Sequence, residues 1–206
     1  MADAVARFIA DLAQEPTGSL VNQYAVEIEG LDRRGAAAIR RANLESYLER
    51  RLGARLALVG EAPSAHGARF FGIAFTAERS LAPSQRTSAP GLKRDGFTEH
   101  SATILRQALA TAGIDPADVI LWNAVPFHPA RIGDPLRNRP PSAGELILGA
   151  RWLDRFLALM RPGRIVAVGQ TACRALPPGT PVVRHPANGG SSQLAADLVA
   201  LRASLD

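Results

Sequence analysis

The chain has 206 residues, of which 47% are hydrophobic and 21% charged, and its formal net charge is +5. This length and composition predict one globular domain over residues 1–206 that buries about two thirds or more of its unfolded surface. No apolar run approaches the roughly 20 residues of a membrane span, and the first residues lack the layout of a signal peptide. The single cysteine, Cys173, excludes an internal disulfide. We therefore expect a cytoplasmic protein.

The positive charge favours a polyanionic partner without identifying one. Lys93 is the only lysine among the 24 basic residues. A GC-rich genome also encodes arginine in preference to lysine, so the excess of arginine has a second explanation. The composition alone therefore does not identify nucleic acid as the partner, and evidence for it has to come from the motifs.

Strand and helix patterns alternate along the chain. Apolar residues at helical spacing predict helices over 2–13 and 34–51. A short apolar run predicts a strand over 56–59, and the segment 60–98 that follows is rich in Gly, Pro, Ser and Arg. This segment is too long for an ordinary connection between a strand and a helix, which indicates a functional loop.

The second half of the chain continues the alternation. It predicts helices over 99–112, 143–160 and 194–205, and strands over 119–122, 165–168 and 182–183. Strands that alternate with helices pair in parallel and form a doubly wound sheet with helices on both faces. The sequence therefore predicts an α/β fold.

Three apolar runs each end in a residue able to contact a nucleobase. Glu61 follows the first predicted strand, Asn123 ends the second, and His185 follows the short strand at 182–183. In an open parallel sheet, ligands bind beyond the carboxyl ends of the strands. We therefore expect a carboxylate, an amide and an imidazole to meet in one crevice, a set suited to cutting a bond to a polar heterocycle.

In their order along the chain, these motifs resemble those of the uracil-DNA glycosylase superfamily, and most of all its family-four enzymes. The resemblance covers residues 55–200 and includes Asn123 at the end of its strand. The other segments are GEAP at 60–63, GIAFT at 72–76, NRPP at 138–141, RPGRIVAVG at 161–169 and HP at 185–186. The resemblance implies a three-layer α/β/α fold with a short parallel sheet of about four strands. It also implies a repair enzyme that flips deoxyuridine out of DNA and hydrolyses its N-glycosidic bond.

The resemblance gives each strand-end residue a role. Glu61 positions the attacking water or stabilises the positively charged sugar, and His185 donates a hydrogen bond to O2 of the departing base. The amide of Asn123 offers an acceptor to N3–H of uracil and a donor to O4. Cytosine presents the opposite pattern and would leave both amide groups unpaired, at roughly 1–3 kcal/mol each.

Phe75 is the expected stacking platform, because its distance from Glu61 along the chain fits the family pattern. The other expected contacts to uracil are Ala62, Ser64 and Phe71. Ser64 stands where family-one enzymes have a tyrosine that excludes the methyl group of thymine. Methyl exclusion must therefore come from elsewhere or be weaker.

Arginine side chains, loop N–H groups and helix N-termini are expected to hold DNA phosphates. The candidate DNA contacts are His66, Arg86, Lys93, Arg94, Arg131, Arg137, Asn188, Ser191 and Ser192. The segment 86–94 is the strongest of these, because it is basic, loop-like and close in sequence to the predicted base pocket.

Two positions depart from the family-four pattern. Those enzymes hold a four-iron, four-sulfur cluster with four cysteines, whereas here Phe127 stands at one cysteine position and only Cys173 remains in the chain. We therefore expect no cofactor and no metal, with apolar packing in place of the cluster. The segment HPANGG at 185–190 also lacks the Ser and Leu that usually follow His-Pro and wedge into the duplex.

Other functions stay open at this point. Ser64 leaves room for a glycosylase that acts on hypoxanthine or xanthine, or on a mismatched base. A non-catalytic protein that binds uracil or abasic DNA is a further alternative, although the presence of Glu61, Asn123 and His185 together argues against it. A Rossmann nucleotide binder is disfavoured because no glycine fingerprint follows Val59. The expected partners are uracil-containing DNA, single- or double-stranded, and free uracil as product, with the protein a monomer.

Overall fold

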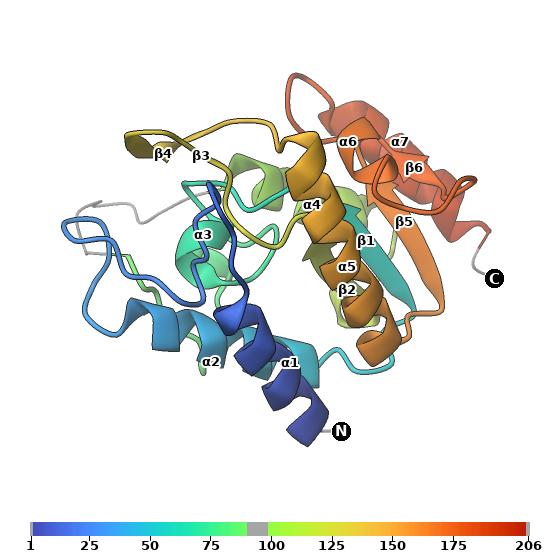
Figure 1. Cartoon of the computed structure of the whole chain (residues 1–206). Helices are drawn as coiled ribbons and strands as arrows, with labels where there is room; N and C mark the ends of the chain where they lie inside the picture. The colour runs from blue at the N-terminus through green and yellow to red at the C-terminus, as the bar shows by residue number, and fades with distance from the viewer. Residues whose placement is uncertain (1, 90–98, 205–206) are drawn as a thin grey trace.

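The fold is built around four parallel strands at the centre of a computed structural model that describes residues 2–89 and 99–204. The strands are β1 (Leu56–Gly60), β2 (Val119–Asn123), β5 (Arg164–Val168) and β6 (Val182–Val183). Their order across the sheet is β2-β1-β5-β6 (Figure 1). The chain leaves β1 toward β2 on one side and leaves β5 toward β6 on the other. The direction of connection reverses between β1 and β5, and open α/β sheets bind ligands at such a point.

Helices cover both faces of this sheet. One face carries α1 (Ala2–Gln14), α2 (Ala36–Glu49), α5 (Ala143–Met160) and α6 (Gln170–Cys173). The other face carries α4 (His100–Thr111) and α7 (Ser191–Arg202), which pack against each other. The short elements are α3 (Ala68–Phe71), the 3-10 turns η1 (Glu78–Ser80) and η2 (Pro116–Asp118), and the strands β3 (Ala130–Arg131) and β4 (Asp134–Asn138). The architecture confirms the predicted α/β/α fold. Within the described residues, no helix is both long and apolar enough to cross a bilayer.

The alternation of side chains along β1 separates two apolar cores. Ala57 and Val59 belong to the core beneath α1, α2 and α5, whereas Leu56 and Leu58 belong to the core beneath α4 and α7. Successive residues of a strand face opposite sides of the sheet, so a strand buried on both faces needs apolar residues at every position. The uninterrupted apolar run at 56–59 follows from this burial.

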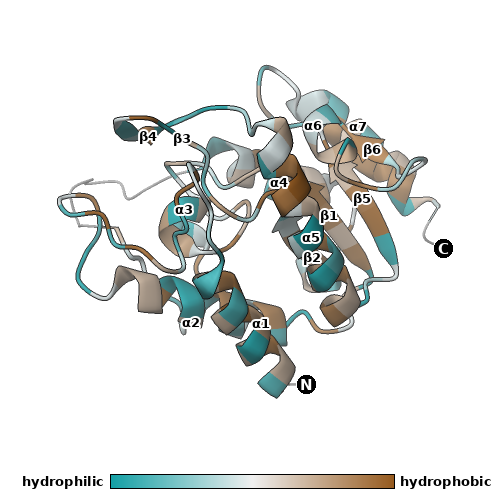
Figure 2. Ribbon diagram, viewed as in Figure 1, coloured by the Kyte–Doolittle hydropathy of each residue, from teal (hydrophilic) through white to brown (hydrophobic). Residues whose placement is uncertain are grey.

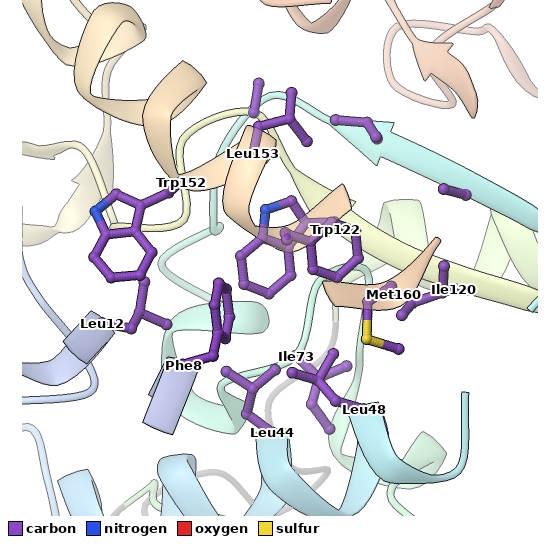
Figure 3. Close-up of a cluster of buried hydrophobic side chains, with 14 of the residues drawn as sticks. Phe8, Leu12, Leu44, Leu48, Ile73, Ile120, Trp122, Trp152, Leu153 and Met160 are labelled. Atoms are coloured by element: carbon purple, nitrogen blue, oxygen red, sulfur yellow. The ribbon is translucent and has the colours of Figure 1, made fainter. Parts of the chain in front are cut away.

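Aromatic side chains fill much of the first core (Figure 3). Trp122 of β2 stacks on Phe156 of α5 with ring centroids 4.3 Å apart, and Phe8 of α1 lies 5.5 Å from Trp152. Phe127 is fully buried and meets Trp152 edge-on, with centroids 6.3 Å apart. Aromatic pairs of this kind contribute about 0.5–1.5 kcal/mol each beyond the burial of their area. Apolar packing thus surrounds the position at which the family-four pattern has a cysteine.

The hairpin β3–β4 lies between the predicted strand at 119–122 and the predicted helix at 143–160, where we expected a loop without strands, so that expectation is corrected. Arg131 pairs with Asp134, which leaves Ile132 and Gly133 as a two-residue turn, and Gly133 has φ +78°. Two-residue hairpin turns need positive φ, which glycine adopts without strain. Both strands are short and largely hydrophilic, as the teal in Figure 2 shows, so no apolar alternation marks them in the sequence. In Figure 1 the hairpin projects from the body of the molecule.

Candidate active site

A cavity of about 270 Å³ opens at the carboxyl ends of the strands. The structure brings together in its wall Glu61 after β1, Asn123 at the end of β2, His185 after β6, and Phe75. Ala62 and Ser64 also line it, as expected. Side chains far apart in sequence therefore meet at the place where the strand order reverses.

A second cavity, of about 190 Å³, lies on another side of Phe75, between α2 and α4. Its lining includes Tyr47, Leu105 and Leu109, and none of its described lining residues is a carboxylate or a histidine. We therefore place the candidate chemistry in the first cavity.

Gly60 lets two site residues approach the end of β1. A Cβ atom at residue 60 would lie 2.5 Å from Cε2 and Cζ of Phe75, and 2.8 Å from Oδ1 of Asn123. Both distances are shorter than van der Waals contact, so a larger residue would displace the ring or the amide. The backbone N–H of Val125 donates to the carbonyl oxygen of Glu61 at 2.9 Å. This bond continues the pairing of β1 with β2 and holds Glu61 beside Asn123.

Phe75 has a left-handed backbone conformation, with φ +49°. Residues other than glycine rarely adopt this conformation, which costs of order 1–3 kcal/mol. The side chain is buried, and its ring centroid lies 6.4 Å from that of His185, with the two planes at 45°. The strained backbone thus accompanies a ring that lies over the end of β1, where a flat heterocycle can stack on its face.

His185 is arranged as a neutral hydrogen-bond donor. The backbone N–H of Ala187 donates to Nδ1 of His185 at 3.1 Å, which places the ring proton on Nε2. Burial lowers the pKa of His185, while the charge of Glu61 opposes this shift and that of Arg184 adds to it. The imidazole is therefore neutral at pH 7 and retains Nε2–H as its single donor.

Glu61 and Asn123 keep their polar groups for a ligand. Within residues 2–89 and 99–204, neither the Glu61 carboxylate nor the Asn123 amide makes a hydrogen bond to another group of the protein. Asn123 is buried, with 6% of its surface exposed. The amide lines the open cavity, so a ligand bound there can use its donor and its acceptor groups.

Glu99 is a lining residue that sequence reasoning missed. It is buried against Gly67, and its Oε2 accepts a hydrogen bond from the N–H of Ala68 at 3.0 Å. Burial raises the pKa of Glu99 to about 7, and the Ala68 bond only partly opposes the shift. Glu99 precedes α4, and its sequence context resembles an ordinary helix start, so no local signal distinguishes it. The cavity therefore holds a second acidic group that carries a proton part of the time at neutral pH.

One expected base contact lies elsewhere. Phe71 is fully buried in a separate apolar cluster with Phe70 and Ala89, and it is not among the residues that line the cavity. A side chain in that cluster cannot stack on a base held between Asn123 and His185. Phe71 therefore lies outside this cavity, whereas Phe75, the other expected aromatic contact, lines it.

The expected DNA contacts that the structure describes lie on the surface. His66, Arg86, Arg131, Arg137, Asn188, Ser191 and Ser192 are all exposed. Lys93 and Arg94 lie outside the described residues. No group of three or more His, Cys, Asp or Glu side chains able to hold a metal ion occurs in the described part of the chain.

The fold and the site together define a class of protein. It is a three-layer α/β/α domain whose strand ends hold a carboxylate, an amide and an imidazole around one cavity. The family model of the uracil-DNA glycosylase superfamily matches residues 49–200. The chain belongs to this superfamily and is a DNA glycosylase, a hydrolase of DNA repair. A search among curated proteins finds no match.

Solved structures share the fold. The crystal structure of wild-type Pedobacter heparinus SMUG2 is 15% identical in sequence, with a TM-score of 0.69. The match covers 99% of this chain and 97% of that chain. Similarity at this level of identity concerns the arrangement of the backbone, which agrees with the α/β/α fold described above.

Proposed function

We propose that this protein excises uracil from DNA as a monofunctional glycosylase, releasing free uracil and leaving an abasic site. The observation that carries the proposal is the bond from Ala187 N–H to Nδ1 of His185, which leaves Nε2–H as a donor in the cavity that holds Asn123. A neutral imidazole donor and an amide suit the O2 and the N3–O4 edge of uracil respectively. We propose a cytoplasmic monomer of one domain that acts on single- or double-stranded DNA.

Recognition begins when the nucleotide leaves the base stack, because its sugar bond is inaccessible in the duplex. The flipped base stacks on Phe75, and the Asn123 amide accepts from N3–H and donates to O4. Ala62 and Ser64 line the same cavity and complete the contacts. Ser64 is too small to exclude the thymine methyl group by itself, so exclusion falls to the fit of the ring between Phe75 and the cavity wall.

Bond cleavage then separates charge along the C1′–N1 bond. The electron pair of this bond moves to the base, and negative charge on O2 is stabilised by Nε2–H of His185, in the manner of an oxyanion donor. The sugar gains positive charge, which the Glu61 carboxylate stabilises. A water molecule held by Glu61 adds its oxygen to C1′ and gives one proton to the Glu61 carboxylate, which passes it to solvent. The uracil anion takes up a proton from solvent, so the products are neutral uracil and the abasic sugar. The outer surface with Arg86, Arg131, Asn188 and Ser191 is proposed to hold the phosphates.

A deaminated purine is the second candidate substrate, and Glu99 is the observation that favours it. A purine leaves more easily when it is protonated, and the partly protonated Glu99 carboxyl lies in the wall of the cavity. The small Ser64 side chain lines the same cavity. The substitution Glu99→Gln separates the two candidate substrates. Glutamine cannot supply this proton, so the substitution should slow hypoxanthine release far more than uracil release.

The test is base release from labelled oligonucleotides that carry uracil, hypoxanthine or xanthine, followed by cleavage of abasic sites with alkali. A thymine mismatch and undamaged DNA serve as controls. Loss of uracil release in the double mutant Glu61→Gln/His185→Ala supports the proposal. Tight binding of uracil DNA without release of any base would instead establish the non-catalytic alternative.

A further inference from the structure

Ile132 is the most exposed large apolar side chain in the described part of the chain. It is 98% exposed at the tip of the β3–β4 hairpin, compared with 69% for Ile147 on α5. A single exposed apolar residue is common on protein surfaces and has no meaning by itself. Its place relative to the candidate active site is what gives Ile132 a role.

The hairpin begins and ends at the wall of the cavity. Pro129, directly before β3, and Asn138, at the end of β4, both line the cavity, so the hairpin extends from its rim. Ile132 follows Pro129 by three residues. At about 3.3 Å per residue, the tip reaches roughly 7–10 Å beyond the rim, which matches the depth of about 7.5–8.5 Å of the DNA grooves.

Hydrogen bonds tie the base of the hairpin to the loop that carries Glu61. The backbone N–H of Ala65 donates to Oδ1 of Asn138 at 2.9 Å. The buried ring of His128 lies between two carbonyl oxygens, with Nδ1 2.8 Å from O of Pro63 and Nε2 3.1 Å from O of Pro135. The neutral ring donates to one of these at a time. The tip is therefore fixed relative to the catalytic loop.

The charge of the hairpin suits a nucleic-acid partner. Arg131 precedes the tip on one strand and Arg137 lies on the other, and both side chains are exposed, with Asp134 the single acidic residue of the two strands. Proteins that bind the minor groove use Arg, Lys, Asn or Gln side chains there and frequently insert an apolar side chain between base steps. The arginines hold the backbone, and the apolar side chain replaces stacking contacts.

The segment that follows His185 offers no comparable side chain. Its residues after Pro186 are Ala187, Asn188, Gly189 and Gly190, none of which is a large apolar residue. A flipped nucleotide leaves a gap in the duplex, and some group has to fill that gap to keep the base from returning. Among the residues that the structure describes, the hairpin is the element beside the cavity that carries a large, fully exposed apolar side chain.

We infer that Ile132 enters the base stack of duplex DNA beside the flipped nucleotide, and that Arg131 and Arg137 bind the adjacent phosphates. The inference rests on the proposed function for its substrate. It predicts a specific dependence on strandedness: a wedge is needed only where a base stack must be held open, so single-stranded DNA does not require Ile132.

The test compares single-turnover uracil release from duplex and single-stranded oligonucleotides of the same sequence. Ile132→Ala should lower the duplex rate by roughly tenfold or more, because the cost of unstacking is no longer offset. It should leave the single-stranded rate within about twofold. Ile132→Leu should retain the duplex rate, and Ile147→Ala is the matched control. Since Ile132 contacts solvent almost entirely, its loss does not threaten folding. Equal rates for Ile132→Ala and wild type on duplex DNA, or equal losses on both substrates, would overturn the inference.

A second measurement separates this inference from the proposed function. A duplex with 2-aminopurine beside a stable abasic analogue reports unstacking as increased fluorescence, whether or not the protein cleaves any base. Wild type should raise the fluorescence and Ile132→Ala should not. If wild type releases no uracil but still unstacks the probe through Ile132, the proposed function fails and the wedge stands. If neither protein changes the fluorescence, the wedge fails.

Discussion

The phenyl ring of Phe75 lies directly over Gly60, so close that a Cβ atom on residue 60 would be 2.5 Å from two ring carbons. The Phe75 ring and the end of β1 therefore pack as one unit. The strained backbone of Phe75, with φ +49°, belongs to the same contact.

Gly60→Ala should destabilise the protein and lower uracil release, because the added methyl group pushes the ring off the end of β1. Overpacking of this kind costs about 1–3 kcal/mol, measurable by urea unfolding. Gly144→Ala is the control, since a Cβ there meets nothing within 4 Å. In a double-mutant cycle, Phe75→Ala should recover part of the stability lost in Gly60→Ala. Strict additivity of the two changes would contradict the contact.

Asn123→Asp should sharply reduce uracil release, because a carboxylate cannot donate to O4 of the base. If the new carboxyl group is protonated, it gains trace activity on cytosine. The measurement is base release from uracil and cytosine oligonucleotides, with circular dichroism to check folding. Equal rates for mutant and wild type on uracil DNA would remove Asn123 from the site.

Glu61→Gln and His185→Ala should each lower the single-turnover rate by roughly 10²-fold or more, as the loss of one charge stabiliser typically does. Affinity for uracil DNA should change only a few-fold, because both groups act mainly on the transition state. The double mutant should lose less than the product of the single effects, since Glu61 acts on the ionisation of His185. Parallel losses of binding and rate would mark either residue as structural.

Glu99→Gln should stabilise the protein at pH 8 and change little at pH 4.5. The pKa of Glu99 rises from 4.5 to about 7 on folding. As pH rises through this window, the unfolded chain loses a proton that the folded protein keeps. The free energy of unfolding of the wild type therefore falls as pH rises through this window, by up to roughly 3 kcal/mol at 1.36 kcal/mol per pH unit. Above this window the contribution of Glu99 no longer changes with pH. Urea unfolding at several pH values checks this, with the exposed Glu49→Gln as control. A mutant whose pH profile parallels wild type would refute the assignment.

Neutralising Arg86, Lys93 and Arg94 together should weaken DNA binding for every sequence. Each phosphate contact releases counterions and contributes about one to the slope of log affinity against log salt. Loss of three contacts should therefore reduce this slope by up to about three. The measurement is binding to duplexes with and without uracil between low and moderate salt, with the exposed Arg7 of α1 neutralised as control. An unchanged slope would mean that the segment 86–94 faces away from DNA.

Sequence reasoning reached the parts of the molecule that depend on local pattern. The apolar runs of β1, β2 and β5 stand out in the sequence because both faces of the sheet are covered. Parallel pairing then places Glu61, Asn123 and His185 at the same end of the sheet, beyond the carboxyl ends of its strands. The hairpin with Ile132 was missed, because its strands are short and polar. Glu99 was missed because its burial arises from Gly67, which lies far from it in the chain. Phe71 was misplaced because spacing along the chain does not reveal toward which cluster a loop side chain turns.

Phe127 changes what this protein needs from the cell. Its ring is buried against Trp152, at the position that the resemblance to family-four enzymes equates with a cysteine, and the chain has a single cysteine. A core closed by side chains is complete as soon as the polypeptide folds, without a cluster-assembly pathway or a supply of iron. With one cysteine, the chain cannot by itself supply four thiolate ligands, so a four-cysteine cluster offers oxidants no target in this protein.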